Sequence, residues 1–306
     1  MAAKPSLLLL VDSRSYIRSN CYQSQLATTL KRNFRIRMMS LRELRYAPLA
    51  NPRAYDVVLS VLKLRSLLAK LDLLKRFLRD RAIHVYEQDI WQAYMDDSPQ
   101  RGSYEAIART LNLKKLLLTS RWWTQFAREK GLPAVFVRMG MLPELCDAGP
   151  DWESRPIKVG FQGTLHPHRK KFFGELRSRG LDVTVLPSGS YAAYLQNLHA
   201  MGVFLHTEDA PWRVNGTLLP RNALWIKETE VAARGTFAIR DHEDEAEAYE
   251  ISELPTIMTF RSVSEVPDLV ARIEAMFPAE RRERMVASAE AMRQRNDWMT
   301  VVRELQ

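Results

Sequence analysis

Two charged side chains in the second half of the chain lie one helical turn apart, at a place suited to a nucleotide. Residues 222–241 (NALWIKETEVAARGTFAIRD) are typical of a helix that stops at Gly235 and leads into a short apolar strand. Lys227 and Glu230 are three residues apart, so they face the same side of this helix. Such a carboxylate can accept both hydroxyls of a ribose, and the lysine can reach a diphosphate. The alternative is an exposed ion pair that stabilises the helix by about 0.3 kcal/mol.

A second stretch joins a glycine turn to a group of cations. Residues 158–171 (KVGFQGTLHPHRKK) predict a strand that ends near Gly163 and Thr164, followed by a helix with Arg169 and Lys170 in its first turn. Cations at a helix N-terminus oppose the helix dipole, so their presence favours a bound anion that also uses the backbone N–H groups. A tight turn with a solvated basic end would have the same sequence. The stretch contains neither Gly-Lys-Ser/Thr nor Gly-x-Gly-x-x-Gly.

Carboxylates follow two expected strands of the first half, at positions where they could act as general bases. Asp89 and Glu87 come directly after a strand expected at 83–86, and Asp12 follows one expected at 6–11. The carboxyl ends of parallel strands meet at one edge of a sheet, where ligands bind. Asp89 is the first candidate for a general base, Glu87 the second and Asp12 the third. The alternative for Asp89 is the N-cap of the helix that follows it.

Short apolar runs alternate with amphipathic segments along the chain, and this alternation predicts two doubly wound α/β domains. Strands are expected at residues 6–11, 35–39, 55–61, 83–86, 116–119 and 134–137, and in the second half at 157–161, 182–186, 203–205, 237–239 and 257–259. Long helices are expected at 62–81 and 279–303. Residues 142–156, which hold three prolines and no periodic pattern, are expected to link the domains.

The charge is divided unevenly between the two halves. Residues 1–150 hold 25 Lys/Arg and 13 Asp/Glu, a net of +12, whereas the rest hold 20 and 23, a net of −3, within a total of +9. A basic first half favours an anionic partner such as nucleic acid, a phospholipid surface or an acidic glycan; the alternative is a solubilising surface. The basic amphipathic helix at 62–81 can make peripheral contact with a membrane, but its leucines are also what a sheet would cover. No DNA- or RNA-binding signature accompanies the charge.

Composition restricts the class of protein. The chain has 306 residues and is 46% hydrophobic, which suits two globular domains with sizeable cores. Its two cysteines, Cys21 and Cys146, form neither a disulfide framework nor a zinc motif. The apolar run at 6–11 is too short for a signal peptide or a transmembrane segment. These features predict a cytoplasmic protein without a transmembrane segment.

Several of these motifs together resemble a known family. Residues 227–236 (KETEVAARGT) resemble the R-x-F-E-A-x-A-C-G-T segment of GT-B glycosyltransferases, particularly the group that includes CgeB-like spore-maturation proteins. In that group a strand followed by G-F-x-G and a helix opens the C-terminal domain, as GFQG does at 160–163. Residues 117–140 (LLTSRWWTQFAREKGLPAVFVRMG) also have the group's arrangement before the linker. The resemblance covers residues 115–280 in order and spacing, and residues 1–110 in fold pattern only.

The resemblance implies an α/β protein of the GT-B fold, with two Rossmann-like domains facing a cleft and a C-terminal helix that crosses back to the first domain. The domains implied are an acceptor-binding domain at 1–141, a linker at 142–156, a nucleotide-sugar-binding domain at 157–280 and the returning helix at 281–306. The activity implied is hexosyltransferase-like transfer from a nucleoside-diphosphate sugar to an acceptor hydroxyl. The acceptor is expected to be a glycan or an anionic molecule, with lipid-linked and DNA acceptors both possible.

Carried over by position, the resemblance makes Glu230 the ribose ligand and gives the diphosphate to the turn and its cations. The donor-binding residues that it implies are Gly163, Thr164, Arg169, Lys170, His206, Lys227 and Glu230. His206, at the end of an expected strand, is the weakest of these, because a histidine there is more often a satisfied core or turn residue. No Asp-x-Asp ends a strand in the second half, so no metal or other cofactor is expected.

The sequence also departs from the family pattern. Glu228 stands where an apolar residue is usual, Arg234 where a small residue is common, and Ala223 where a second carboxylate is expected. These departures support an alternative, a non-catalytic protein that binds nucleic acid or an anionic surface on a degenerate GT-B scaffold. A sugar-nucleotide epimerase of the same architecture is a third possibility.

Overall fold

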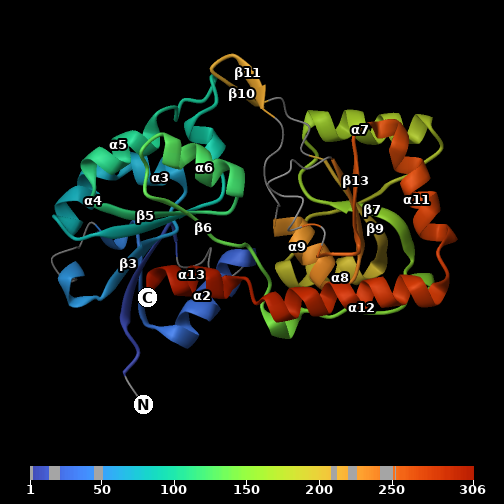
Figure 1. Cartoon of the computed structure of the whole chain (residues 1–306), viewed down its shortest axis with the longest axis horizontal. Helices are drawn as coiled ribbons and strands as arrows, with labels where there is room; N and C mark the ends of the chain where they lie inside the picture. Colours follow the sequence, from blue (N-terminus) through green and yellow to red (C-terminus); the bar gives the residue numbers. More distant parts are fainter. Residues whose placement is uncertain are drawn as a thin grey trace. The chain divides into compact units, whose positions relative to one another are not determined.

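The computed structural model describes residues 3–13, 21–44, 51–207, 212–219, 226–241, 251 and 253–306. The chain divides into two compact units (Figure 1). Unit 1 comprises Met1–Arg138, Trp212–Leu219 and Trp298–Gln306, and unit 2 comprises Met139–Pro211 and Pro220–Asp297. By this division unit 1 carries 27 Lys/Arg and 12 Asp/Glu, a net of +15, and unit 2 carries 18 and 24, a net of −6.

Unit 1 contains a parallel sheet of six strands in the order β2-β1-β3-β4-β5-β6. The strands are β1 (Ser6–Val11), β2 (Arg35–Ser40), β3 (Val57–Ser60), β4 (Ile83–Glu87), β5 (Leu113–Leu118) and β6 (Ala134–Phe136). The leucines of β1 are all buried between β2 and β3, as a continuous apolar run in a parallel sheet requires. All six strands lie close to their expected positions.

Helices cover both faces of this sheet, with α3 to α6 on one face and α2 and α13 on the other (Figure 1). The helices are α2 (Cys21–Asn33), α3 (Leu64–Ala69), α4 (Leu71–Leu78), α5 (Ser103–Thr110), α6 (Arg121–Glu129) and α13 (Trp298–Leu305), with short 3-10 turns η2 (Pro52–Ala54) and η3 (Ile90–Ala93). The single helix expected at 62–81 is two helices, because Lys70 leaves the helical conformation at φ −124° and ψ 16°. Leu67 and Leu74 still reach the core from either side of the break.

Unit 2 contains a parallel sheet of five strands in the order β13-β12-β9-β7-β8. The strands are β7 (Ile157–Gln162), β8 (Thr184–Leu186), β9 (Met201–His206), β12 (Phe237–Asp241) and β13 (Ile257–Phe260). Its helices are α7 (Pro167–Ser178), α8 (Tyr191–Ala200), α9 (Ile226–Ala233), α11 (Val266–Ala275) and α12 (Pro278–Arg295), with 3-10 turns η4 (Pro143–Leu145), η5 (Trp152–Ser154) and η6 (Val263–Glu265). The core lies between β7, β9 and β12 and the helices α8, α9 and α12.

The segment 142–156, expected to link the domains, is instead packed into unit 2, which begins at Met139. Cys146 and Ala148 are buried in the core of unit 2. The Arg155 guanidinium is also buried, and it donates to the carbonyl oxygens of Ala148 and Met201 at 2.8 Å each. The prolines therefore indicated irregular backbone correctly, but buried contacts hold that backbone in place.

The C-terminal helix expected at 279–303 is also divided. Asn296 adopts a left-handed conformation at φ 40° and ψ 54° and ends α12, which packs on α9 in unit 2. The last helix, α13, lies beside α2 in unit 1, so only the final part of the segment 281–306 returns to the first domain. Among the helices of the described residues, none has the length and apolarity needed to cross a membrane.

A hairpin that the sequence analysis did not predict belongs to unit 1 although both its neighbours along the chain belong to unit 2. Its strands are β10 (Trp212–Val214) and β11 (Thr217–Leu219), joined at Asn215 and Gly216. The Asp96 carboxylate accepts the backbone N–H groups of Asn215 at 2.8 Å and Gly216 at 2.7 Å. Arg101 forms an ion pair with Asp96 at 3.2 Å. The Asn-Gly pair is a strong hairpin signal that could have been used.

Candidate functional site

The carboxyl edge of the unit 2 sheet contains a topological switch point. From β7 the chain crosses to β8 on one side and then returns to β9 on the other, so the ends of β7 and β9 diverge there. Gln162 and Gly163 follow β7, and His206 and Thr207 follow β9. Helix α9 precedes the parallel strand β12, so its N-terminal end, with Lys227 and Glu228, reaches the same edge. The donor residues predicted from the sequence therefore gather at one edge.

Arg169 bridges the two loops that leave the switch point. It lies in the first turn of α7 but turns inward and is only 5% exposed. Its Nη1 donates to the carbonyl oxygen of Thr164 at 2.9 Å, and its Nε donates to that of Thr207 at 3.2 Å. The Lys170 side chain, by contrast, is exposed and makes no hydrogen bond or ion pair with the described residues. The two cations therefore have different roles, one holding loops and one facing solvent.

Lys227 reaches across to the glycine turn. Its Nζ donates to the carbonyl oxygen of Gln162 at 3.1 Å and lies 5.1 Å from the centre of the Phe161 ring. A Cβ at position 163 would lie 2.2 Å from this Nζ, so any larger residue in place of Gly163 would displace the ammonium group. The glycine thus allows a lysine from one helix to lie against the end of a neighbouring strand.

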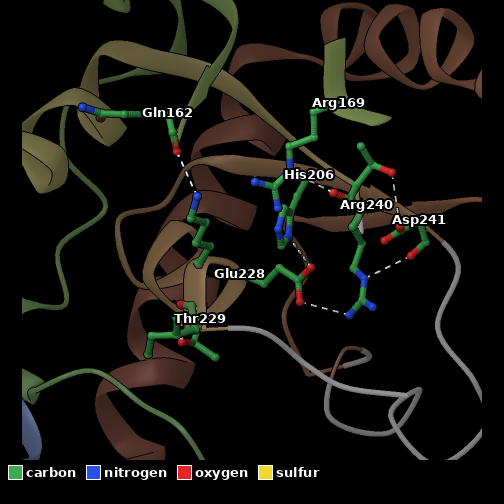
Figure 2. Close-up of polar contacts among 10 residues, drawn as sticks. Gln162, Arg169, His206, Glu228, Thr229, Arg240 and Asp241 are labelled. Carbon is green, nitrogen blue, oxygen red and sulfur yellow. Dashed lines mark hydrogen bonds and ion pairs between the residues drawn. The ribbon is translucent and has the colours of Figure 1, made fainter. Parts of the chain in front are cut away.

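A buried ionic network lies beside these cations (Figure 2). Glu228 Oε1 is 2.9 Å from His206 Nδ1, and Glu228 Oε2 is 3.1 Å from Arg240 Nη1. All three side chains are at most 1% exposed. Arg240 Nε also donates to the carbonyl oxygen of Asp241 at 3.1 Å. Charges buried this deeply are tolerated because they are paired. Glu228, which stands where an apolar residue is usual, is thus paired with Arg240.

Glu230 is a buried carboxylate of this edge whose surroundings change its proton affinity. It is 3% exposed, and the Tyr191 hydroxyl donates to its Oε1 at 2.5 Å. Burial raises the pKa of Glu230 to about 7, against the opposing effects of the Tyr191 hydrogen bond and the Lys227 charge. Tyr191 stands at the start of α8, where Ser190 caps the helix. The carboxyl group can therefore gain or lose a proton near neutral pH.

Unit 1 contains a pocket of about 440 Å³ at the carboxyl ends of β3 and β4. Twelve residues line it: Gln23, Val61, Leu62, Lys63, Leu64, Arg65, Tyr86, Glu87, Gln88, Asp89, Gln92 and Gln100. Asp89 is partly exposed and stands at the N-cap position of η3, but its side chain makes no capping hydrogen bond. The capping alternative is therefore wrong for the side chain, which lines the pocket instead.

The other two carboxylates proposed as bases have structural partners. Glu87 Oε1 accepts the backbone N–H groups of Gln88 and Asp89 at 2.8 Å each, and its Oε2 accepts the Tyr104 hydroxyl at 2.5 Å. Burial raises the pKa of Glu87, and these hydrogen bonds oppose the shift. Asp12 accepts the backbone N–H of Lys63 at 3.0 Å. Of the three, Asp89 is the one that both lines the pocket and is partly exposed.

Solved structures resemble this arrangement over nearly the whole chain, whereas comparisons of the sequence with protein-family models and with curated proteins give no match. Anabaena Alr3699/HepE in complex with UDP is 13% identical, with 98% of both chains covered and a TM-score of 0.61. An alpha-glucosyltransferase in complex with UDP-glucose and DNA containing an abasic site is 10% identical, with 99% of this chain and 98% of that chain covered and a TM-score of 0.65. Sucrose-phosphate synthase from Thermosynechococcus elongatus is 11% identical, with 98% and 97% covered and a TM-score of 0.62.

The chain has the GT-B fold. The two parallel sheets and the coverage of both units confirm the expected GT-B fold and the prediction of two doubly wound domains. Identities of 9–14% establish the GT-B fold but not the roles of individual residues. The assignments of the donor residues and of Asp89 therefore remain predictions.

Sequence reasoning missed several residues of these GT-B sites. Arg240 and Tyr191 contact the predicted residues Glu228 and Glu230 directly, and Gln100 lines the pocket of unit 1. A charged residue inside the apolar run FAIRD was the signal for Arg240. Among the described residues, no group of three or more His, Cys, Asp or Glu side chains is arranged to hold a metal ion.

Proposed function

We propose that the protein is a glycosyltransferase that moves a sugar from a nucleoside-diphosphate sugar to an acceptor hydroxyl. The observation that carries this proposal is the grouping of Arg169, Lys227 and Glu230 at the switch point of a GT-B domain. Similar structures were solved with UDP or UDP-glucose, so uridine nucleotides are the first donors to test.

In the proposed donor complex Glu230 accepts the ribose hydroxyls, and Tyr191 gives up or shares its hydrogen bond to the carboxylate. Lys227 and the backbone of Gly163 and Thr164 hold the diphosphate, with Lys170 as a second cation. Arg169 acts on the diphosphate mainly by fixing the loops, because its hydrogen bonds go to the carbonyl oxygens of Thr164 and Thr207. His206, held through Nδ1 by Glu228, is assigned to the donor sugar.

The reaction requires stabilisation of the departing diphosphate and a base for the acceptor hydroxyl. The bond between the anomeric carbon and the diphosphate weakens first, and fixed cations stabilise the charge that develops on the departing oxygen. We assign this role to Lys227 and Lys170, without a metal ion. An acceptor hydroxyl must lose its proton as it attacks, and Asp89 in the pocket of unit 1 is the proposed base if the sugar configuration inverts.

The experiment is an assay of donor turnover. The full chain is incubated with UDP-glucose, then with other nucleotide sugars, in the presence and absence of EDTA. Water takes the place of the acceptor hydroxyl, and release of the nucleoside diphosphate is followed by chromatography. The expected result is release that EDTA does not reduce. Asp89→Asn should lower it roughly 100-fold or more, because a general base is lost. The exposed Asp97→Asn serves as the matched control. Absence of turnover with every nucleotide sugar would overturn the proposal.

A further inference from the structure

Helices α3 and α4 form a basic ridge on unit 1. Between Lys63 and Arg79 the chain carries six Lys/Arg and one Asp/Glu. Five of these residues are exposed or partly exposed, and their charged groups make no hydrogen bond or ion pair with the described residues: Arg65, Lys70, Lys75, Arg76 and Arg79. A net charge this high on two short helices favours an anionic surface as the partner of this ridge.

The ridge is apolar as well as basic. The helix break at Lys70 opens a hollow of about 370 Å³ on the surface, lined by Leu68, Ala69, Leu71 and Leu73 together with charged residues of α4. These three leucines are partly exposed, whereas Leu67 and Leu74 are buried in the core. The ridge therefore presents a second apolar strip between its cations. Nucleic acid phosphates would pair with the cations but leave the leucines against water, whereas acyl chains would cover them.

The hollow and the polar pocket of unit 1 share helix α3. Leu64 and Arg65 line the pocket, and Leu68 and Ala69, one turn later, line the hollow. Four residues of a helix span roughly 6 Å. One amphiphilic molecule can therefore place a polar head in the pocket and an apolar chain over the ridge, with its phosphate beside Lys63 and Arg65.

The pocket suits a hydroxylated ring. Four glutamines line it, and an amide both donates and accepts, as sugar hydroxyls require. Gln100 Oε1 is buried and accepts no hydrogen bond from the described residues, so it is ready to accept one from a ligand. Tyr86, the aromatic residue of the lining, is 4% exposed, so it offers no open face on which a flipped nucleobase could stack.

We propose that unit 1 docks on an anionic lipid surface through α3 and α4 and takes its acceptor from that surface, as a sugar ring joined to lipid through a phosphate. The identity of the acceptor rests on the proposed glycosyl transfer. The docking does not, because it can be measured without any nucleotide.

The first test is sedimentation of the full chain with phosphatidylcholine vesicles that contain either no anionic lipid or a fraction of phosphatidylglycerol. The chain should pellet with the anionic vesicles only, and less at high salt. Each cation near such a surface changes partitioning about fivefold, so Lys70→Gln/Arg76→Gln should weaken binding about 25-fold. Lys31→Gln/Arg32→Gln removes the same charge from α2, on the other face of the unit 1 sheet, and should bind like the wild type.

Equal binding to neutral and anionic vesicles would overturn the docking, as would equal losses in the two double variants. Tighter binding to duplex DNA than to vesicles, lost in the ridge variant, would assign the ridge to nucleic acid instead. A Leu73→Gln variant should weaken vesicle binding without changing its salt dependence, because it removes apolar contact only.

The second test concerns the pocket. Phosphatidylinositol carries a hydroxylated ring on a phosphate and has the same charge as phosphatidylglycerol. The wild type should prefer phosphatidylinositol vesicles several-fold at equal charge, and Gln100→Leu should bind both equally. No preference in the wild type would overturn the assignment of the pocket to a lipid-linked ring. Loss of donor turnover with vesicle binding intact would contradict the proposed function alone.

Discussion

Both units contain a parallel sheet, but the side chains at the carboxyl edges of the two sheets differ in their chemistry. Unit 1 ends in a pocket that four glutamines line together with charged residues, and Glu87 is buried there among neutral donors. In unit 2 the buried carboxylate Glu228 meets the charged partner Arg240 instead. The difference suits two ligands: uncharged hydroxyls need polar groups that donate and accept, whereas a diphosphate needs cations. Lys227 and Arg169 supply cations at that edge, and each donates to carbonyl oxygens of the loops there.

The largest expected effect comes from breaking the ion pair of unit 2. Arg240→Met removes the arginine that pairs with the buried Glu228 carboxylate and should lower the free energy of unfolding by about 4 kcal/mol. The double variant Glu228→Leu/Arg240→Met removes both charges and should recover most of this loss. Urea denaturation measures both values. A double variant as unstable as the single one would mean that the pair is not the source of the effect.

The next effect is a pH dependence that Glu230 should give unit 2 near neutrality. The folded-state pKa of Glu230 is about 7, above its ordinary value of 4.5, so folding favours the protonated form. The stability that this group contributes is complete below pH 4.5 and is lost as the pH rises to about 7. Over that window the wild type should lose about 3 kcal/mol relative to Glu230→Gln. Parallel stability curves for the two proteins would contradict the assigned pKa.

A smaller effect is expected at the corresponding carboxylate of unit 1. Glu87→Gln keeps the size of the side chain and an oxygen for the N–H groups of Gln88 and Asp89. It exchanges charged hydrogen bonds for neutral ones, so the free energy of unfolding should fall by about 1 kcal/mol. Denaturation at one pH measures the loss. If this variant cost as much as Arg240→Met, the distinction between neutral and ionic partners would not hold.

The smallest effect should be local to the hairpin of unit 1. Asp96→Ala removes the acceptor for the N–H groups of Asn215 and Gly216 and the partner of Arg101. These groups are largely exposed, so the melting temperature should hardly change. Hydrogen exchange at the two amides should become faster, while exchange in β1 stays the same. Unchanged exchange at Asn215 would show that Asp96 does not hold the hairpin.

The sequence predicted the sheets well because continuous apolar runs such as residues 6–11 fit little other than buried parallel strands. Breaks in helices were harder to predict. The leucines of 62–81 keep their spacing across Lys70, so nothing in the periodicity marks the break. The C-terminal segment also breaks within a segment expected to be one helix. Asn296 adopts the left-handed conformation there, and its residue type, which favours that conformation, was the signal for the break.

The candidate sites were predicted in part, because strand ends in a parallel sheet bring together residues from distant segments. Lys227, Glu230 and Arg169 could be placed at one edge in this way, but the partners of Glu228 depend on side-chain packing. Likewise, whether Asp89 caps a helix or lines a pocket depends on its rotamer, which the sequence does not determine. The pairing of a departure at 228 with an arginine at 240 is visible only in three dimensions.

The most direct test of the nucleotide site is a thermal-shift screen with UDP, GDP, dTDP, ADP and CMP on the wild type and on Glu230→Ala, with the partly exposed Glu175→Ala as the control. A ligand at 100-fold above its Kd should add roughly 2.7 kcal/mol of stability, a shift of several degrees. We expect one nucleoside diphosphate to stabilise the wild type and the control but not Glu230→Ala. No shift with any nucleotide, or an equal shift in all three proteins, would contradict a donor site at the carboxyl edge of unit 2.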